Sequence, residues 1–332
     1  MSPSCDCQTM PVPWALVAVR AVHYSTCLLL FGLAGFDRLV ASPVARRNRP
    51  LGPSDSLGMS RCGGWAVLVL LVAALASGVA WLVLVAGEMA EVPPLQAWNE
   101  GTVLKAWDQT RIGAAWQFRT ACLAAAFAAA ALLALVRPPS RIRGAAAWLL
   151  LVSTAAMIAG LAWAGHGLAG QAATGIFHGI ADVLHLLISG LWPAGLLPFA
   201  ITLRRLRRSA LPGAAALTAA TVRRFSAFSL ISVSALSLTG LVNSWVLLGS
   251  VGALFHTRYG QTLAVKLALF LVMVGFGAVN LLILKPHIAR DLSDRQQAPL
   301  RWLRFNITSE LFLGTLIVLI VALLGMLAPA AE

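Results

Sequence analysis

The chain has 332 residues, of which 59% are hydrophobic and 11% are charged, and its 25 Lys and Arg outnumber its 12 Asp and Glu. Soluble globular chains carry about 45–50% apolar and about 25% charged residues. The composition therefore excludes a soluble enzyme, a disordered chain and a nucleic-acid-binding protein, despite a net charge of +13. Five cysteines without a paired CxxC array exclude a disulfide framework and a structural zinc domain. An integral membrane protein is expected.

Eight stretches are long and apolar enough to cross a bilayer, which takes about 20 helical residues. They are 14–38, 64–87, 112–136, 145–165, 176–201, 225–249, 260–284 and 306–328. Their continuous apolar character indicates helices and not the alternating strands of a barrel. We expect an all-α, polytopic membrane helix bundle, with 1–13 as an N-terminal tail and 14–328 as a single domain. No internal repeat is evident in the sequence.

The segments that join these stretches alternate in charge. The first, third, fifth and seventh connections hold most of the lysines and arginines, whereas the second is acidic. Since cytoplasmic connections carry the excess of Lys and Arg, both termini are expected on the outer side of the membrane and the four basic connections in the cytoplasm. The arginine groups are also suited to anionic lipid head groups. The second connection, with Trp98 and Trp107, is expected to be an ordered loop at the outer interface.

The first and fourth stretches place histidines toward the outer side of the membrane. In the first stretch, Arg20, His23 and Cys27 share one helical face. His23 lies roughly 13 Å below the outer boundary, at 1.5 Å of rise per residue. The fourth stretch ends at the outer rim in Gly165-His166-Gly167.

The fifth stretch carries the densest group of ionisable side chains, in the run HGIADVLH. His178, Asp182 and His185 are spaced by four and three residues, so they share one helical face. Ionisable side chains inside a bilayer are costly, and they mark a functional site by default. His185 comes to about the same depth as His23. Three helices are therefore expected to direct imidazoles into one pocket in the outer half of the bilayer.

Imidazole and carboxylate groups are ligand types that suit copper, and sulfur favours its reduced form. The candidate copper ligands are His23, His166, His178, Asp182 and His185. Arg20, Arg119, Lys266, Asn243 and Trp192 are candidate supporting residues, and Cys5, Cys7 and His256 are further candidates for metal capture. The sequence has no Ser/His/Asp arrangement, phosphate loop or HExxH motif, so no enzymatic activity is expected.

Several stretches resemble the copper resistance protein D family (CopD/PcoD type). The clearest is 257–286, with Thr-x-Tyr-Gly at its start, Lys266 on the following helix, Asn280 near its end and Pro286 after it. The resemblance covers about residues 107–290 and weakens around His23. It includes Thr110-Arg111-Ile112-Gly113 with Trp116 and Arg119, Gly165-His166, the pair Asp182 and His185, Trp192, and Gly195-Leu196. Departures from the family pattern occur at Gly167, Pro193 and Leu281.

This resemblance implies an inner-membrane protein that handles copper together with a periplasmic, CopC-like copper-binding partner, and that contributes to copper resistance or homeostasis by uptake. Two other functions fit the residues alone. Histidines on facing helices are the usual axial ligands of haem, so His23 and His185 would suit a haem-binding electron-transfer protein. The other is an assembly factor that delivers copper to a respiratory oxidase.

Overall fold

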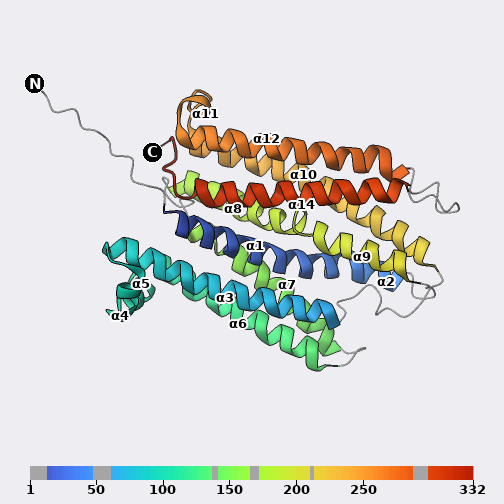
Figure 1. Cartoon of the computed structure of the whole chain (residues 1–332), viewed down its shortest axis with the longest axis horizontal. Helices are drawn as coiled ribbons and strands as arrows, with labels where there is room; N and C mark the ends of the chain where they lie inside the picture. Colours follow the sequence, from blue (N-terminus) through green and yellow to red (C-terminus); the bar gives the residue numbers. More distant parts are fainter. Residues whose placement is uncertain are drawn as a thin grey trace, which may run out of the picture.

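The computed structural model describes residues 13–47, 61–136, 141–164, 172–209, 213–286 and 298–331. Within these ranges it has eight helical segments long and apolar enough to cross a membrane, as the sequence predicts. They lie side by side along a common axis (Figure 1). Their helices are α1 (Trp14–Phe36), α3 (Arg61–Ala90), α6 (Arg111–Leu135), α7 (Arg141–Ala159), α8 (Ala172–Leu191) with α9 (Leu196–Arg208), α10 (Ala214–Leu248), α12 (Arg258–Val279) and α14 (Ala298–Leu324).

The fifth segment is not one uninterrupted helix, as the run 176–201 suggests. It breaks after Leu191 and resumes at Leu196 as α9. Pro193 has no amide hydrogen to donate, and its ring does not fit the interior of a helix. Gly195 follows, and a Cβ there would overlap the carbonyl oxygen of Leu191. The segment then runs to Arg208, beyond the expected end.

Two connections contain short helices at the end of the bundle where α1 begins and the C-terminus lies, here called the terminal end (Figure 1). The ordered loop expected after α3 instead forms α4 (Pro94–Asn99) and α5 (Thr102–Gln109). Pro94 stands at the first position of α4, where its missing N–H costs nothing. Helix α11 (Ala253–His256) occupies the connection between α10 and α12.

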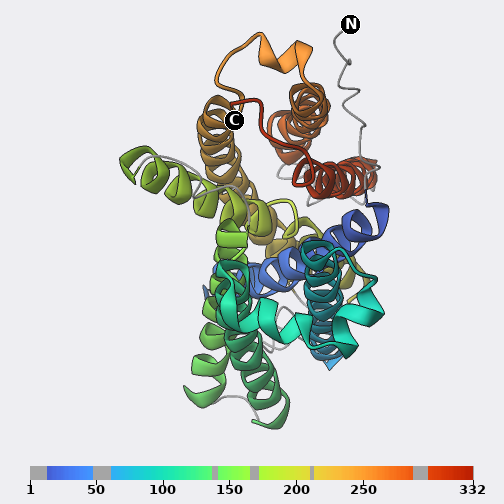
Figure 2. The same cartoon turned by 90° about the vertical axis from the view of Figure 1, so that its left-hand side faces the viewer.

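The eight segments divide into two units of four. The first unit is α1, α3, α6 and α7; the second is α8–α9, α10, α12 and α14. The helices α1 and α8 lie between the other members of the two units (Figures 1 and 2). The first helix of each unit packs against the last helix of the other, since α1 contacts α14 and α8 contacts α7. Where α1 meets the fifth segment, a Cβ on Gly32 would lie 2.8 Å from Ala194, so close helix packing requires glycine there.

The two units also share a local motif, which corrects the expectation that the chain has no internal repeat. After the short helices, each unit has a Thr-Arg-x-Gly sequence that starts its third long helix. Thr110 accepts a hydrogen bond from the amide of Gly113 at 2.9 Å, and Thr257 accepts one from Gly260 at 3.0 Å. Each threonine hydroxyl also donates to the carbonyl four residues earlier. Sequence identity between the units is confined to such short motifs, so inspection of the chain misses the repeat.

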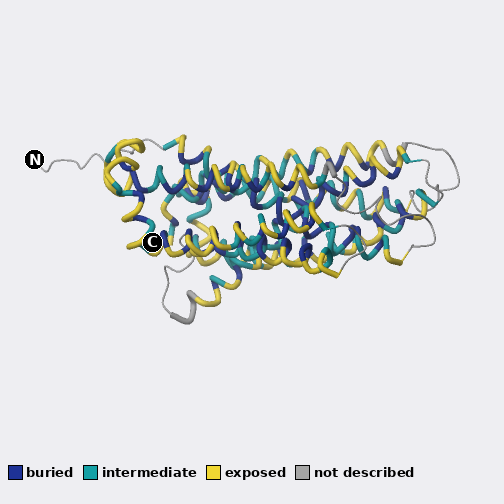
Figure 3. The backbone as a smooth tube through the Cα atoms, turned by 90° about the horizontal axis from the view of Figure 1, so that it is seen from below, coloured by how far each residue is buried: buried dark blue, intermediate teal, exposed yellow. Residues whose placement is uncertain are grey.

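Exposed residues run along the outside of the bundle and buried residues face its interior (Figure 3). Many of the exposed side chains are large and apolar, including Val69, Ile231 and Leu241. In a bilayer these side chains face lipid, so their exposure costs no free energy.

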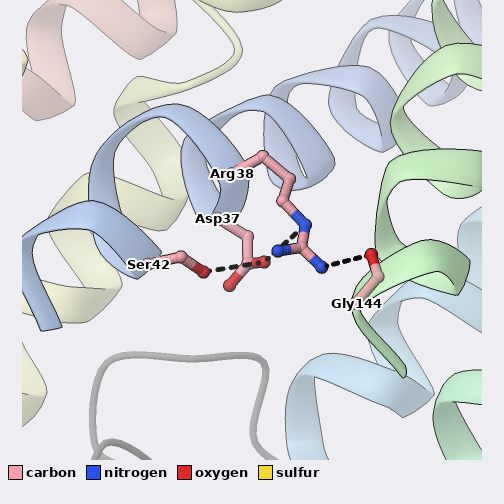
Figure 4. A network of polar contacts seen from close by, with 4 residues as sticks. All are labelled: Asp37, Arg38, Ser42 and Gly144. Atoms are coloured by element: carbon pink, nitrogen blue, oxygen red, sulfur yellow. Dashed lines mark hydrogen bonds and ion pairs between the residues drawn. The ribbon is translucent and has the colours of Figure 1, made fainter. Parts of the chain in front are cut away.

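At the opposite end, here called the basic end, a polar network fastens α1 to α7 (Figure 4). A π-helical segment, Asp37–Ala41, links α1 to α2 (Ser42–Arg47). Arg38 donates to the carbonyl of Gly144 at 2.9 Å and lies 3.9 Å from the carboxylate of Asp37. Ser42 donates to the same carboxylate at 3.5 Å.

Candidate functional site

The first unit holds a buried polar group around His23, here called the first cluster: His23 on α1, Ser77 and Trp81 on α3, and Trp116 and Arg119 on α6. His23 and Arg119 are 3% and 2% exposed. The guanidinium of Arg119 lies 4.4 Å from the ring centre of Trp116 and donates a hydrogen bond to Nε2 of His23. The cluster therefore places a cation on the histidine and on an aromatic face.

Both ring nitrogens of His23 are engaged in this arrangement. A guanidinium can only donate, so Nε2 accepts and the ring proton resides on Nδ1. Nδ1 then donates to the hydroxyl of Ser77 at 3.0 Å, and that hydroxyl donates to the carbonyl of Ala73 at 2.6 Å. The sulfur of Cys27 lies 3.5 Å from Nε2. A metal ion can reach His23 only if Arg119 moves away.

Arg20 makes no hydrogen bond to His23 or Arg119, although it shares the helical face of His23, and it contacts the cluster only through Trp81. It donates to the carbonyl of Gly325 at 2.9 Å and to the hydroxyl of Tyr24 at 3.1 Å. Its guanidinium also lies 5.1 Å from the ring centre of Trp81. Arg20 thus connects α1 to the C-terminal end of α14.

The second unit holds the second cluster: His178, Asp182 and His185 on α8, Thr239 and Asn243 on α10, and Lys266 on α12. Asn243 donates to a carboxylate oxygen of Asp182 at 3.2 Å. Asp182 also interacts electrostatically with His178 and with Lys266. The structure thus brings five of the residues expected from the sequence near one another: His178, Asp182, His185, Asn243 and Lys266.

The proton on His185 is assigned by the same reasoning as that on His23. Thr239 donates its hydroxyl hydrogen to the carbonyl of Ala235 at 2.8 Å. The oxygen of Thr239, 3.0 Å from Nδ1 of His185, must therefore accept from that nitrogen. Nε2 of His185 then carries the lone pair, which is the form that ligates metals.

Two buried polar atoms of the second cluster have no hydrogen-bond partner in the described part of the chain: Nδ1 of His178 and Oδ1 of Asn243. Buried polar atoms are almost always satisfied, so an unsatisfied pair beside a carboxylate calls for an explanation. An imidazole nitrogen, an amide oxygen and a carboxylate together offer donors to a cation. The second cluster is the better candidate for holding one.

The expected single pocket of convergent imidazoles is not observed. His23 faces α3 and α6, whereas His185 faces α10. Spacing along a helix shows which residues share a face, but not which neighbour that face meets. The described residues contain no group of three or more His, Cys, Asp or Glu side chains placed to hold a metal ion together. The separation also removes the geometric basis for a haem held between His23 and His185.

The other expected site residues lie apart from the second cluster. Trp192 is 2% exposed and lines a cavity nearer the basic end, where its ring packs edge-on against Phe270. His256 is exposed on α11. Cys5, Cys7 and His166 lie outside the described residues, so their assignment as metal ligands stays a prediction.

Sequence reasoning missed Ser77 and Thr239, the two hydroxyl groups that fix the histidine tautomers. A hydroxyl within an apolar helix is usually bonded to its own backbone, and both of these residues also make that bond. The spacing holds the missed signal: Ser77 follows His23 by 54 residues, and Thr239 follows His185 by 54.

A third polar group lies at the cavity that Trp192 lines, which has a volume of about 150 Å³. Asn306 donates to Asn280 at 2.8 Å, and Asn280 donates to the carboxyl group of Glu310 at 2.6 Å. Glu310 is 1% exposed, and Asn280 begins a π-helical segment, Asn280–Leu284. Asn280 and Glu310, which lie 30 residues apart in the chain, thus form one hydrogen-bonded chain with Asn306.

The fold and the second cluster define a multi-pass membrane protein with buried nitrogen and oxygen donors. The family model for "Copper resistance protein D-like, N-terminal domain" matches residues 10–176, and the model for "Copper resistance protein D" matches residues 219–324. The chain is 30% identical to Copper resistance protein D of Pseudomonas syringae pv. tomato, over 95% of this chain and 97% of the relative. The chain therefore belongs to the copper resistance protein D family, and it is a multi-pass inner-membrane protein that handles copper.

Two further relatives match over shorter ranges. Copper transport protein CutJ of Bacillus subtilis is 34% identical over 36% of this chain and 21% of its own length. Inner membrane protein YebZ of Escherichia coli is 27% identical over 54% of this chain and 59% of its own length. No solved structure matches the chain significantly.

Proposed function

We propose that the chain is a copper transporter, not an enzyme, and that it takes copper from the periplasm through the second cluster. The proposal is carried by two buried atoms that have no hydrogen-bond partner among the described residues and could ligate a metal ion. They are Nδ1 of His178 and Oδ1 of Asn243, and the Asn243 side chain is hydrogen-bonded to the carboxylate of Asp182. Copper is the cargo here, so it must be bound and then released. A site with few ligands, partly open to exchange, suits that need better than a closed structural site.

The orientation of the chain in the membrane is inferred from the charge distribution. The arginine-rich segments, including α2 and the end of α9, lie at the basic end. The positive-inside rule assigns that end to the cytoplasm, so the terminal end and both termini would lie in the periplasm. The second cluster then lies in the periplasmic half of the membrane, since Asn243 is near the end of α10 and Lys266 is near the start of α12.

A periplasmic copper-binding protein of the CopC type is the proposed donor of the copper. It would approach the terminal end, where the short helices α4 and α5 connect α3 to α6 and α11 connects α10 to α12. The exposure of His256 on α11 supports this, and His256 would contact such a partner. The N-terminal cysteines would act at the same end.

Copper accumulation in cells tests the proposal. Cells expressing His178→Ala or Asp182→Asn are expected to lose copper-dependent accumulation, while the variant proteins still insert into the membrane. Val69→Ala, at a lipid-facing position of α3, is the matched control and should accumulate copper like the parent chain. Full accumulation in both cluster variants would contradict the proposal.

A further inference from the structure

The two clusters repeat the same hydrogen bonds at equivalent positions. Nδ1 of His23 meets the hydroxyl of Ser77 at 3.0 Å, and Nδ1 of His185 meets that of Thr239 at 3.0 Å, and the hydroxyl residue follows the histidine by 54 positions in both units. Each hydroxyl donates to the carbonyl of the residue four positions earlier. Two unrelated sites would not be expected to share a hydroxyl partner, the same ring nitrogen and the same separation along the chain.

The glycines next to these hydroxyl residues repeat as well. A Cβ on Gly78 would lie 3.3 Å from Cε1 of His23, and a Cβ on Gly240 would lie 3.3 Å from Cε1 of His185. In both units, therefore, the imidazole ring lies against a glycine of the neighbouring helix.

A basic side chain occurs at the same place in both units. Arg119 lies nine residues after Thr110, and Lys266 lies nine residues after Thr257, which are the two equivalent helix caps. Arg119 interacts electrostatically with His23, and Lys266 does so with His185. Each histidine thus lies within the electrostatic influence of a cation carried by the third long helix of its own unit.

The two units differ in how close that cation comes. In the first unit α3 packs against α6, and Arg119 donates directly to Nε2 of His23. Among the described residues of the second unit, α10 and α12 have no comparable contact, and Lys266 acts on His185 without a hydrogen bond to it. The second unit also has a carboxylate, Asp182, where the first has Arg20 one turn before its histidine.

We propose that the clusters are two copies of one cation site, in which a tethered side-chain cation and a metal ion compete for Nε2 of the histidine. Arg119 keeps the first copy closed, and Lys266 leaves the second copy open to copper. A lone pair accepts either a donor hydrogen or a metal ion, but not both. Arginine is always charged and holds several donors rigidly, whereas lysine is a flexible point charge, so Lys266 is the more easily displaced. This inference rests on the proposed copper site at the second cluster.

Copper titration of the purified full chain, once with Cu(I) and once with Cu(II), tests the competition. Lys266→Met removes the competing charge at similar length and should lower the dissociation constant by about tenfold, which corresponds to about 1.4 kcal/mol. Lys266→Arg should raise it, because it supplies the group that closes the first copy. Arg119→Met should add a second bound copper per chain. Gln261→Met, on an exposed turn of α12, is the matched control.

The outcomes separate the inference from the proposed function. Unchanged affinity in both Lys266 variants would overturn the competition, even if His185→Ala abolishes binding. Unchanged binding in His185→Ala would instead contradict the copper site itself. Should Arg119→Met fail to fold, the dissociation constants of Lys266→Met and Lys266→Arg still test the competition, because they are expected to change in opposite directions.

Discussion

Thr239 accepts a hydrogen bond from Nδ1 of His185 at 3.0 Å, and through this contact a residue of α10 decides which nitrogen of an α8 side chain can bind a metal. Such orienting partners are as important to a site as the ligands themselves. Neither residue is exposed to the aqueous ends of the bundle, so the tautomer is set within the membrane.

Replacing Thr239 by Val should weaken copper binding about tenfold, in the range known for lost orienting partners. It should also destabilise the fold by about 1–3 kcal/mol, because the ring N–H of His185 loses its buried acceptor. Copper titration and thermal unfolding of the purified protein measure the two effects. Thr239→Ser should restore both, and a Val variant with normal affinity would show that the hydroxyl has no role in orientation.

Gly240 provides the surface on which His185 lies. A methyl group there would be 3.3 Å from Cε1 of the ring, so Gly240→Ala should displace the imidazole and reduce copper accumulation. Gly275→Ala is the matched control, since a Cβ at that position on α12 has no neighbour within 4 Å. Equal copper accumulation in the two variants, measured by elemental analysis of cells, would be the contrary result.

Asp182 supplies the carboxylate of the second cluster and interacts electrostatically with Lys266. Asp182→Asn keeps the shape but leaves the lysine charge uncompensated, so copper affinity should fall by more than about tenfold. Asp182→Glu should retain part of the affinity because the negative charge remains. Titration of the purified variants decides between a charge effect and a shape effect: similar losses in Asn and Glu would mean that shape dominates.

The chain from Asn306 through Asn280 to Glu310 should act as one unit in stability. Asn280→Leu leaves the buried carboxyl group without its donor and should cost about 1–3 kcal/mol. The double variant Asn280→Leu with Glu310→Leu should be less destabilised than the sum of the single variants, because neither partner is then left unsatisfied. Thermal unfolding in detergent provides the comparison, and strict additivity would contradict the coupling.

The number of spans and the bundle class follow from the sequence, because continuous apolar runs and alternating basic connections have few other interpretations. The helical face of His178, Asp182 and His185 follows from spacing as well. The partners of that face do not, because Thr239 and Asn243 come from α10, and no local pattern states which helix packs on α8. For the same reason the sequence wrongly predicted that His23 and His185 share one pocket, because their depth is known from spacing but the helices they face are not.

The repeat illustrates a different limit. Its signal is present in the sequence as two Thr-Arg-x-Gly motifs. Arg119 and Lys266 each follow the threonine of their motif by nine residues. Four identical or similar residues among two long apolar segments do not stand out by eye. The hydrogen bonds of Ser77 and Thr239, together with the contacts of Gly78 and Gly240, show that the two units are equivalent in three dimensions.

Copper uptake into proteoliposomes containing the purified chain is the most direct test of transport through the second cluster. The parent chain should carry copper into the vesicles, and the double variant His178→Ala with Asp182→Asn should carry none, although both proteins are incorporated equally. Uptake by the double variant at the parent rate would contradict the account, since copper would then cross the membrane by a route that does not involve these two side chains.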